Sequence, residues 1–578
     1  MTANPNTLAC DAFVAALAAS GLEHVCITPG SRSTPLTVAF AKNPAIKSWL
    51  HLDERSSAFF ALGLARQTGT PVALVCTSGT AASNYHPAVV EANHSRIPLI
   101  VCTADRPQRL RDVGADQTMD QVRMFGANAR WAMDLALPGA SGPAARYFEG
   151  VATRAMRAAA HPLPGPVHLN MPFEEPLLGP PDEQRKVPQT ARGYFNRPAT
   201  PPDSASMGPA LAVLREARRP ILVAGPETGG LPATSIAVLA KQIGAPILAD
   251  PLSGLRMGDH DLSQVLDSYD AMFRDARWKT LTPDAIVRFG GVPTSKALNQ
   301  ALAALEGTPH ILCDQPGSWR DPEQVATHVV QGDSSLIAIG MANRLSESSG
   351  TGWLAEWVGR NAAARRAMQS AAAEFAEPFE GRVFTELQAL AEPWSTIVVG
   401  NSMPVRDADS FLVSDPKPVS IVGNRGVNGI DGVNSTALGA AAGSHRRVTL
   451  VIGDISFYHD LNGLWAARKH GLALTVVLVN NNGGGIFHYL PQASHDDIFE
   501  EWFGTPPDLD FAPTVQMYGG EFTRVGDWAD FAAQVGNPGR GLKVVEVRTD
   551  RLQNTAMHRE AWAAAAEAAW GANVAVNA

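Results

Sequence analysis

Residues 451–487, VIGDISFYHDLNGLWAARKHGLALTVVLVNNNGGGIF, carry the pattern that decides the fold. One apolar run ends at Gly453-Asp454, a helical stretch of about three turns follows, and a second apolar run ends at Asn480-Asn481-Asn482. The spacing suits a single strand-helix-strand crossover, so we expect the two strands to be parallel neighbours. Their carboxyl ends then meet at one edge of a sheet, where open α/β sheets bind ligands.

The side chains at these strand ends predict a metal-bridged diphosphate site. Asp454 and Asn481 offer a carboxylate and an amide oxygen, and the glycine-rich turn at Gly483 leaves a backbone carbonyl free. Hard oxygen ligands suit Mg²⁺ when a phosphate and water complete the octahedron. The turn after Gly453 also opens a helix, whose free N–H groups favour a phosphate. The alternative is an ordinary crossover in which Asp454 and Asn481 only cap turns.

The rest of the chain repeats this alternation of strands and helices. Short runs rich in Val and Ile alternate with Ala-rich segments of helical period, which is typical of parallel sheets covered by helices. We expect strands at 24–28, 72–77, 97–103, 219–225, 245–250, 284–290, 309–314, 395–400, 418–423, 447–454, 474–481 and 542–549. The predicted fold class is α/β, with three doubly wound parallel-sheet domains in series. A final helix is expected within 557–572, ended by Gly571.

Composition marks the breaks between these domains. Residues 172–204 are rich in Pro, which cannot sustain a helix or an inner strand. A second break lies at residues 346–352, SESSGTG. We therefore expect domains at residues 1–185, 186–360 and 361–578.

Composition also excludes several classes of protein. The 578 residues are 45% hydrophobic and 18% charged, which predicts a chain that is folded throughout. The net charge of −9 and the scattered basic residues argue against a nucleic-acid partner, and no window approaches ~18 uninterrupted apolar residues, which argues against a membrane partner. The N-terminal segment lacks a cationic start, so we expect a cytoplasmic protein. The five cysteines form no Cys-x-x-Cys pair and are expected to be buried, reduced thiols.

The 451–487 segment, with its opening Gly453-Asp454 and closing NNNGGG, resembles the diphosphate-binding motif of the thiamine diphosphate enzyme superfamily. The resemblance implies that Asp454, Asn481 and the carbonyl of Gly483 hold Mg²⁺, with Mn²⁺ as the alternative, because an all-oxygen site does not separate the two. It places Ser456 near the diphosphate. No Gly-x-Gly-x-x-Gly sequence follows an early strand, so a nicotinamide cofactor has no support.

A second superfamily feature is Glu54, within SWLHLDERSSAFFALGLA at residues 48–65. The resemblance implies that Glu54 faces the pyrimidine N1′ of thiamine diphosphate, where sharing a proton assists release of the proton at C2. An apolar surrounding would raise the pKa of Glu54 and favour that sharing. The segment at 73–92, with its Thr-Ser-Gly turn, matches the same domain. The alternative is that Asp53 and Glu54 only complement a helix dipole.

The resemblance further implies an apolar wall and shared active sites. Ile430 matches the bulky residue that holds the cofactor bent, and Ile486, Phe487 and Leu490 extend the wall. In the superfamily the N-terminal domain of one subunit faces the C-terminal domain of another. The three predicted domains would then be the pyrimidine-binding, middle and diphosphate-binding domains of a homodimer or homotetramer with active sites at the subunit interface.

Several segments together resemble one family, 2-succinyl-5-enolpyruvyl-6-hydroxy-3-cyclohexene-1-carboxylate synthase. They are TPGSRSTPL (28–36), DERSSAFFALGLA (53–65), CTSGTAASNY (76–85), TADRPQRLRDVGADQT (103–118), GNSMPVRDAD (400–409), GNRGVNGIDG (423–432), NNNGGGIF (480–487) and, more weakly, VRFGGVPTSKAL (287–298). Members decarboxylate 2-oxoglutarate on thiamine diphosphate and add the resulting succinyl carbanion equivalent to isochorismate by conjugate addition, in menaquinone or phylloquinone biosynthesis. The resemblance implies this transferase activity here.

The substrates are rich in carboxylates, which Arg pairs with in planar, bidentate fashion. Family positions place Ser31, Arg32, Arg106, Gln117 and Lys296 on the isochorismate side, and Ser402, Arg406 and Arg425 on the succinyl side. If the segment after Ser402 is helical, Ser402 and Arg406 share a face. Two residues depart from the pattern: Asp116 adds a negative charge beside Gln117, and Ala297 stands where some relatives have a second basic residue.

Two other functions stay open on the sequence. Another thiamine diphosphate-dependent 2-oxoacid decarboxylase or carboligase would need small apolar substrate contacts and would tolerate loss of Arg406 or Arg425. A non-catalytic binding module would keep the fold without chemistry. The presence of Glu54, Asp454 and Asn481 argues against that module.

Overall fold

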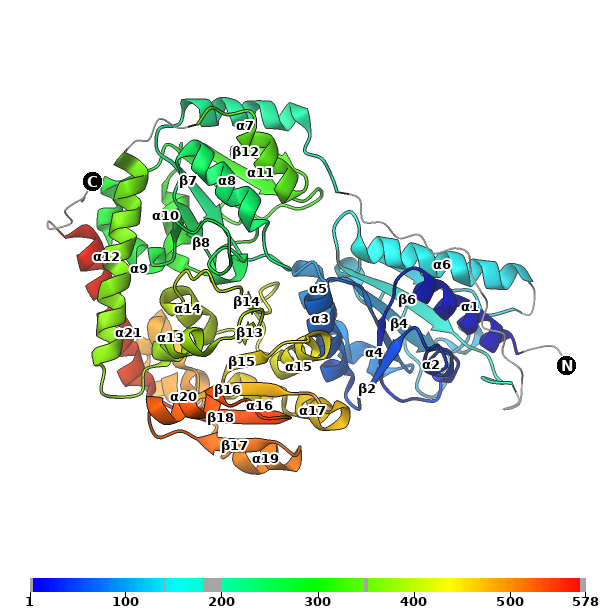
Figure 1. Ribbon diagram of the computed structural model, residues 1–578. Coiled ribbons are helices and arrows are strands. Elements are labelled where there is room, and N and C mark those ends of the chain that lie inside the picture. Colours follow the sequence, from blue (N-terminus) through cyan, green and yellow to red (C-terminus); the bar gives the residue numbers. More distant parts are fainter. Residues whose placement is uncertain (1–3, 140–141, 180–198, 348–351, 572–578) are drawn as a thin grey trace. The chain divides into compact units, whose positions relative to one another are not determined.

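The computed structural model describes residues 4–139, 142–179, 199–347 and 352–571. These residues form three six-stranded sheets with helices between the strands (Figure 1). Neighbouring strands run parallel in every sheet. The predicted α/β class with three parallel sheets is therefore confirmed.

The first sheet has the strand order β2-β1-β3-β4-β6-β5. Its strands are β1 (His24–Ile27), β2 (Lys47–Leu50), β3 (Val72–Cys76), β4 (Leu99–Asp105), β5 (Trp131–Asp134) and β6 (Pro166–Pro172). The helices of this part are α1 (Pro5–Ala19), α2 (Thr34–Ala41), α3 (Glu54–Thr68), α4 (Thr80–Asn84), α5 (His86–His94) and α6 (Gly142–Ala160). Every residue of β3, β4 and β6 is buried, as expected for inner strands covered on both faces.

The second sheet has the order β12-β11-β10-β7-β8-β9. Its strands are β7 (Pro220–Ala224), β8 (Ile247–Ala249), β9 (Val265–Leu266), β10 (Ala285–Phe289), β11 (His310–Asp314) and β12 (His328–Gln331). The helices here are α7 (Ser204–Glu216), α8 (Ala233–Ile243), α9 (Tyr269–Phe273), α10 (Lys296–Ala304), α11 (Ser334–Ala342) and α12 (Gly352–Glu374).

The third sheet has the order β14-β13-β15-β16-β18-β17. Its strands are β13 (Thr396–Val399), β14 (Ser420–Val422), β15 (Val448–Gly453), β16 (Leu474–Asn480), β17 (Glu521–Arg524) and β18 (Leu542–Arg548). Its helices are α13 (Glu380–Leu390), α14 (Met403–Phe411), α15 (Val433–Gly443), α16 (Asp454–His459), α17 (Trp465–His470), α18 (Asp496–Phe499), α19 (Ala512–Met517), α20 (Trp528–Gly536) and α21 (Arg551–Trp570). The final helix ends as predicted, because the N–H of Gly571 donates to the carbonyl of Glu567.

The crossover predicted from residues 451–487 is present, but its helix is broken. β15 and β16 pair in parallel, with Gly453 opposite Val479. Between them the chain forms α16, a short 3₁₀ turn at Leu461–Leu464 and α17 instead of one helix of three turns. The break falls at Asp460, whose buried carboxylate accepts from the Ser435 N–H and the Ser56 hydroxyl. These partners, which are distant in sequence, hold Asp460 in a non-helical conformation.

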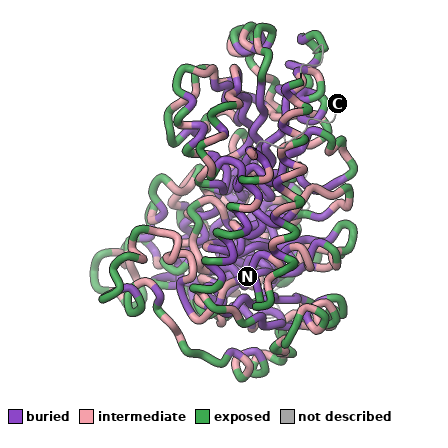
Figure 2. Tube along the Cα trace, turned by 90° about the vertical axis from the view of Figure 1, so that its left-hand side faces the viewer, coloured by how far each residue is buried: buried purple, intermediate pink, exposed green. Residues whose placement is uncertain are grey.

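The chain groups into two compact units by its contacts. One unit comprises residues 1–198, 424–445 and 459–473, and the other comprises 199–423, 446–458 and 474–578. Figure 2 shows how buried and exposed residues alternate along the trace. The expected boundary at 185/186 lies outside the described residues, and the one at 360/361 falls within α12. The three domain ranges stay a prediction.

Within the first unit, α3 and α15 pack closely through glycine. A Cβ on Gly439 would lie 2.0 Å from the carbonyl oxygen of Phe60, and one on Gly63 would lie 1.9 Å from that of Thr436. No other residue fits at that separation. This contact fixes α3, which begins at Glu54, against the segment that follows the GNRGVNGIDG loop.

Two smaller expectations concern the cysteines and the membrane. All five cysteines are buried, and none forms a disulfide, as predicted. Among the described residues, none of the helices combines the length and the apolar character needed to cross a bilayer.

Candidate functional site

The two ends of the 451–487 segment meet at the carboxyl edge of the third sheet. Asp454 is the first residue of α16, directly after β15, and its Oδ2 accepts the N–H of Gly483 at 2.8 Å. Its Oδ1 accepts the N–H of Ile455 at 2.9 Å. The predicted convergence of these strand ends is confirmed.

Asp454 is nearly enclosed, with 2% of its surface exposed. Burial raises the pKa of its carboxyl group to about 6, although the N–H groups of Ile455 and Gly483 oppose the rise. A buried carboxylate of this kind is stabilised by a bound cation, which would remove the cost of desolvation.

Asn481 supplies the observation that fits a metal most directly. Its side-chain oxygen, Oδ1, is buried and has no hydrogen-bond partner, while its Nδ2 donates to Glu380 Oε1 at 2.9 Å. A buried amide oxygen without a partner costs free energy unless a ligand satisfies it. The donor set near Gly483 therefore fits a hard cation.

Gly483 is required by its backbone. Its φ of +140° disfavours other residues, and a Cβ there would lie 2.1 Å from the carbonyl oxygen of Gly504. Within the described residues there is no cluster of three or more His, Cys, Asp or Glu side chains arranged for a metal. The arrangement offers one carboxylate, one amide oxygen and backbone carbonyls, which is the hard-oxygen set predicted from the sequence.

Glu380, which the sequence did not single out, lies behind Asn481. Its Oε1 also accepts the Thr549 hydroxyl at 2.8 Å. Burial, with the nearby charge of Asp407, raises the pKa of Glu380 to about 7. In the sequence Glu380 opens a helix and reads as an ordinary N-terminal acidic residue, so no local signal marks it.

Beside Glu380, His558 is fully buried between two acceptors. Its Nε2 lies 2.8 Å from Asp407 Oδ1 and its Nδ1 lies 2.7 Å from the carbonyl oxygen of Asn554. Both partners are acceptors when Asp407 is ionised, an arrangement that favours the protonated ring. Burial lowers the pKa of His558, but the Asp407 carboxylate outweighs it and the pKa is raised.

The predicted apolar residues of this unit lie after β16. Ile486 and Phe487 belong to a 3₁₀ turn at Gly485–Tyr489, and Leu490 ends it, all half-buried. Phe487 packs on Phe503 with ring centroids 5.6 Å apart. Ser456 is buried in the first turn of α16, two residues after Asp454.

The segment after Ser402 is helical, but Ser402 itself precedes α14 with a non-helical backbone, so Ser402 and Arg406 do not share a helix face in the predicted way. Arg406 Nη1 donates to the Ser402 carbonyl oxygen at 2.6 Å. Burial lowers the pKa of Arg406, against the effect of nearby carboxylates that include Asp407. Ser402 has a φ of +67°, a strained value for a residue other than glycine, of a kind that is frequent at ligand sites. Lys296, in the same unit, begins α10 and is exposed.

In the first unit, Glu54 is the first residue of α3 and is half-buried. Burial raises the pKa of its carboxyl group, with a smaller contribution from Asp53, and the Thr28 hydroxyl opposes the rise. This is the direction that proton sharing with a cofactor nitrogen requires. Asp53 caps α3 by accepting the N–H of Arg55 at 2.9 Å, so the capping role falls to Asp53 and leaves Glu54 free for another.

The predicted isochorismate-side residues Arg106 and Gln117 are brought together by Ser78. Arg106 Nη1 donates to Ser78 Oγ at 3.3 Å, and Gln117 Nε2 donates to the Ser78 carbonyl oxygen at 3.0 Å. Gln117 also has a strained φ of +52°. Burial, followed by the charge of Arg32, lowers the pKa of Arg106.

Arg32 is buried and donates to the Phe173 carbonyl oxygen and to Glu175. The charge of Arg32 lowers the pKa of Arg106, while the carboxylates of Glu175 and Asp105 raise it. The carboxylate of Asp116, a residue that departs from the family pattern, also raises the pKa of Arg106. Ser31 is exposed at the turn before α2.

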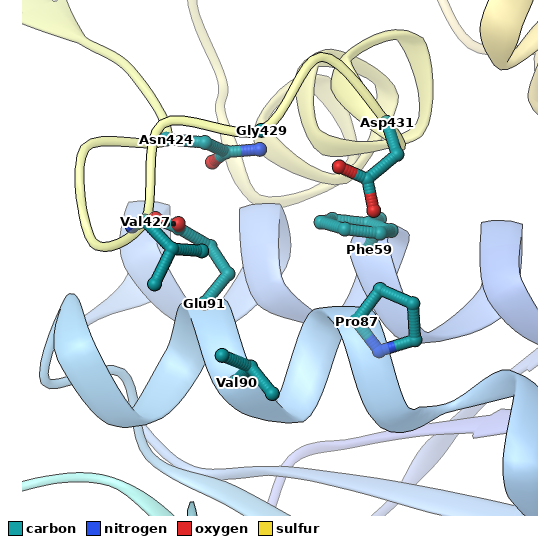
Figure 3. A pocket seen from close by; sticks show the side chains of 8 residues that line it. All are labelled: Phe59, Pro87, Val90, Glu91, Asn424, Val427, Gly429 and Asp431. Carbon is teal, nitrogen blue, oxygen red and sulfur yellow. Dashed lines mark hydrogen bonds between the residues drawn. The ribbon is translucent and has the colours of Figure 1, made fainter.

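The GNRGVNGIDG loop, with Arg425 and the half-buried Ile430, is held by Glu91 of α5. Glu91 is buried, and its two carboxylate oxygens accept the N–H groups of Gly426 and Val427, each at 2.9 Å. Figure 3 shows Glu91 pointing toward the loop, with Asp431 above the ring of Phe59. Here α3, α5 and the loop border an open cavity of about 190 Å³ lined by Phe59, Pro87, Val90, Glu91, Asn424, Val427, Gly429 and Asp431.

Comparison with known families identifies two domains. Residues 9–124 match the thiamine pyrophosphate enzyme N-terminal TPP binding domain, and residues 413–540 match the C-terminal TPP binding domain. Among solved structures, benzoylformate decarboxylase from Polynucleobacter necessarius aligns with a TM-score of 0.72 at 16% identity, over 95% of this chain and 99% of that one. That likeness establishes a shared fold.

Relatives of high identity span nearly the whole chain. A protein of Geobacillus kaustophilus is 48% identical over 95% of this chain and 96% of its own length, and one of Chloroflexus aurantiacus is 44% identical over 95% of both. Both carry the name 2-succinyl-5-enolpyruvyl-6-hydroxy-3-cyclohexene-1-carboxylate synthase. The chain therefore belongs to the 2-succinyl-5-enolpyruvyl-6-hydroxy-3-cyclohexene-1-carboxylate synthase family of thiamine diphosphate enzymes.

Proposed function

We propose that this protein decarboxylates 2-oxoglutarate with thiamine diphosphate and adds the succinyl unit to isochorismate, as a transferase of menaquinone biosynthesis. The observation that carries the proposal is the 48% identity to a synthase of that name over 95% of the chain. The residues that we propose for this chemistry are divided between the two units.

We further propose that Asp454, Asn481 and the carbonyl of Gly483 hold Mg²⁺, or Mn²⁺, at the diphosphate. The partnerless Asn481 Oδ1 and the raised pKa of Asp454 support this assignment. Ser456, in the first turn of α16, would approach the diphosphate near the helix N-terminus.

Thiamine diphosphate, when bound, supplies the electron sink that allows 2-oxoglutarate to lose CO₂. Glu54 would hold a proton at the pyrimidine N1′, which its raised pKa favours. Ile430, Ile486, Phe487 and Leu490 would exclude water, so that the departing carboxylate loses its hydration.

The cationic side chains would orient the two substrates. Ser402, Arg406 and Arg425 would bind the distal carboxylate of 2-oxoglutarate, and Ser31, Arg32, Arg106, Gln117 and Lys296 would bind isochorismate. The guanidinium groups of the buried Arg32 and the half-buried Arg106 are donors of the kind that bind carboxylates.

The assembly we propose is a homodimer or a homotetramer with active sites at the subunit interface, located in the cytoplasm. Family membership supports this assignment, because superfamily active sites draw on an N-terminal and a C-terminal domain of different subunits. No nucleic acid or membrane partner is proposed.

The proposal is tested by mass spectrometry of products, after purified protein is mixed with thiamine diphosphate, Mg²⁺, 2-oxoglutarate and isochorismate. A succinyl adduct of isochorismate, nearly lost in Glu54→Gln, is the expected result. Consumption of 2-oxoglutarate without the adduct would mean that the protein is another thiamine diphosphate-dependent 2-oxoacid decarboxylase or carboligase. In that case Arg406→Met should keep its activity. A protein that bound no thiamine diphosphate would be a non-catalytic binding module.

A further inference from the structure

The side-chain amide of Asn481 has two chemically different ends, and only the oxygen end can bind a cation. Its orientation therefore decides whether Asn481 serves a metal. Its Nδ2 donates to Glu380 Oε1 at 2.9 Å, and its Oδ1 is buried without a partner. Glu380 Oε1 accepts from Asn481 Nδ2 and also from the Thr549 hydroxyl, so this oxygen is an acceptor that receives the nitrogen end of the amide and leaves Oδ1 turned away from it.

Glu380 is itself held from two sides. It is 3% exposed, and its Oε1 accepts the Thr549 hydroxyl at 2.8 Å. Its backbone N–H donates to Asn554 Oδ1 at 3.0 Å. These bonds fix the carboxylate with respect to the strand end that carries Asn481.

The same network continues away from the metal side. The carbonyl oxygen of Asn554 lies 2.7 Å from His558 Nδ1, and the other ring nitrogen lies 2.8 Å from Asp407 Oδ1. Asp407 follows Arg406 on α14, so one buried network links the candidate metal ligand to the helix of the candidate succinyl-binding residues. Groups behind a ligand in this way set its direction and often its affinity.

We infer that Glu380 is a positioning residue, whose carboxylate holds the Asn481 amide with its oxygen toward the metal. The inference rests on the metal site of the proposed function. Glu380 would act through the length of its side chain and its hydrogen-bond acceptor oxygen, and not through its charge acting on the cation at a distance.

Two conservative variants separate the effect of side-chain length at position 380 from the effect of its charge. Glu380→Gln keeps the length of the side chain and an acceptor oxygen but removes the charge. Glu380→Asp keeps the charge but withdraws the acceptor by one methylene group. Glu386→Asp is the matched control, because Glu386 lies on the same helix and pairs only locally, with Arg382 at 2.9 Å.

The probe is Mn²⁺, whose free concentration is measured by electron paramagnetic resonance in the presence of full-length protein and saturating thiamine diphosphate. We expect Glu380→Asp to weaken Mn²⁺ binding by ~10–100-fold and Glu380→Gln to stay within about threefold of the unaltered protein. Glu386→Asp should bind as the unaltered protein does. Melting temperatures without cofactor report whether each variant is folded.

Three results would overturn the inference. One is unchanged affinity in Glu380→Asp, and another is the reverse order, with Glu380→Gln impaired and Glu380→Asp normal, which would show a charge effect. The third is failure of the unaltered protein to bind Mn²⁺ with thiamine diphosphate, which would remove the proposed metal site as well. Tight binding by the unaltered protein and by both variants would remove the inference alone.

Discussion

At the scale of single residues, the candidate site consists of polar groups that folding alone does not satisfy. The Asn481 oxygen lacks a partner, and burial raises the pKa of both Asp454 and Glu54. Each arrangement costs stability in the free protein and is relieved when a cation or a proton-sharing ligand binds. Residues selected for binding are therefore expected to be suboptimal for stability.

Glu54 gives a test of this cost through pH. The pKa of Glu54 is raised in the folded chain, so the folded state binds the proton more tightly than the unfolded state does. The free energy of unfolding therefore falls as the pH rises from the pKa of the unfolded state, about 4.3, through the higher pKa of the folded state. Gln does not titrate there. We expect Glu54→Gln to melt at a higher temperature than the unaltered cofactor-free protein at pH 7.5, with a gap that closes below about pH 4.

Differential scanning fluorimetry across this pH range measures the gap. Glu23→Gln is the control, because Glu23 lies on the same unit outside the site. A Glu54→Gln variant that melted lower than the unaltered protein at pH 7.5 would mean that the carboxylate stabilises the fold.

Most elements that surround the site follow from sequence patterns. The twelve expected strands correspond to β1, β3, β4, β7, β8, β10, β11, β13, β14, β15, β16 and β18, since continuous apolar runs bounded by turn residues specify buried strands. The short strands β2 and β17 were not predicted, because they contain no apolar run. Three of the four residues of β2 and all four residues of β17 are not buried. β6 was also missed, because His168 and Asn170, which both hydrogen-bond to the distant Thr103 hydroxyl, interrupt its apolar pattern.

The site itself was predictable only in part. Asp454, Asn481 and Gly483 stand at strand ends with a distinctive spacing, which the structure brings together. Glu380 and the break at Asp460 depend on partners more than 20 residues away, such as Asn481 and Ser435, and a local pattern cannot report them.

Close packing of α3 on α15 yields a prediction at the scale of elements. A Cβ on Gly439 would lie 2.0 Å from the Phe60 carbonyl oxygen, so Gly439→Ala must push the helices apart, at a cost of about 1–3 kcal/mol. The control is Gly359→Ala, on the exposed face of α12 with no atom near its Cβ, where Ala should be neutral or slightly stabilising. Thermal unfolding of both variants is the measurement. Equal melting temperatures would show that α3 and α15 are not closely packed.

At the scale of the whole molecule, the two compact units each carry part of the proposed chemistry. Glu54, Arg32, Arg106 and Gln117 belong to the first unit, while Asp454, Asn481 and Arg406 belong to the second. The proposed sharing of active sites between subunits would combine the first unit of one chain with the second unit of another.

Mixing two inactive variants tests this sharing. Glu54→Gln lacks the proton-holding residue and Asp454→Ala lacks the metal ligand, so each homodimer has no complete site. After subunit exchange, a shared-site dimer should recover about a quarter of normal activity, because half of the dimers are mixed and each has one intact site. Sites built within single chains would give no recovery.

The metal ligands proposed here are tested most directly by a crystal structure of the full-length protein with thiamine diphosphate and Mn²⁺, using the anomalous signal of the ion. We predict one strong peak about 2.0–2.6 Å from an Asp454 carboxylate oxygen, from Asn481 Oδ1 and from the Gly483 carbonyl oxygen. A peak at a site without Asn481 Oδ1, or bound diphosphate without any peak between these residues, would contradict the proposed site.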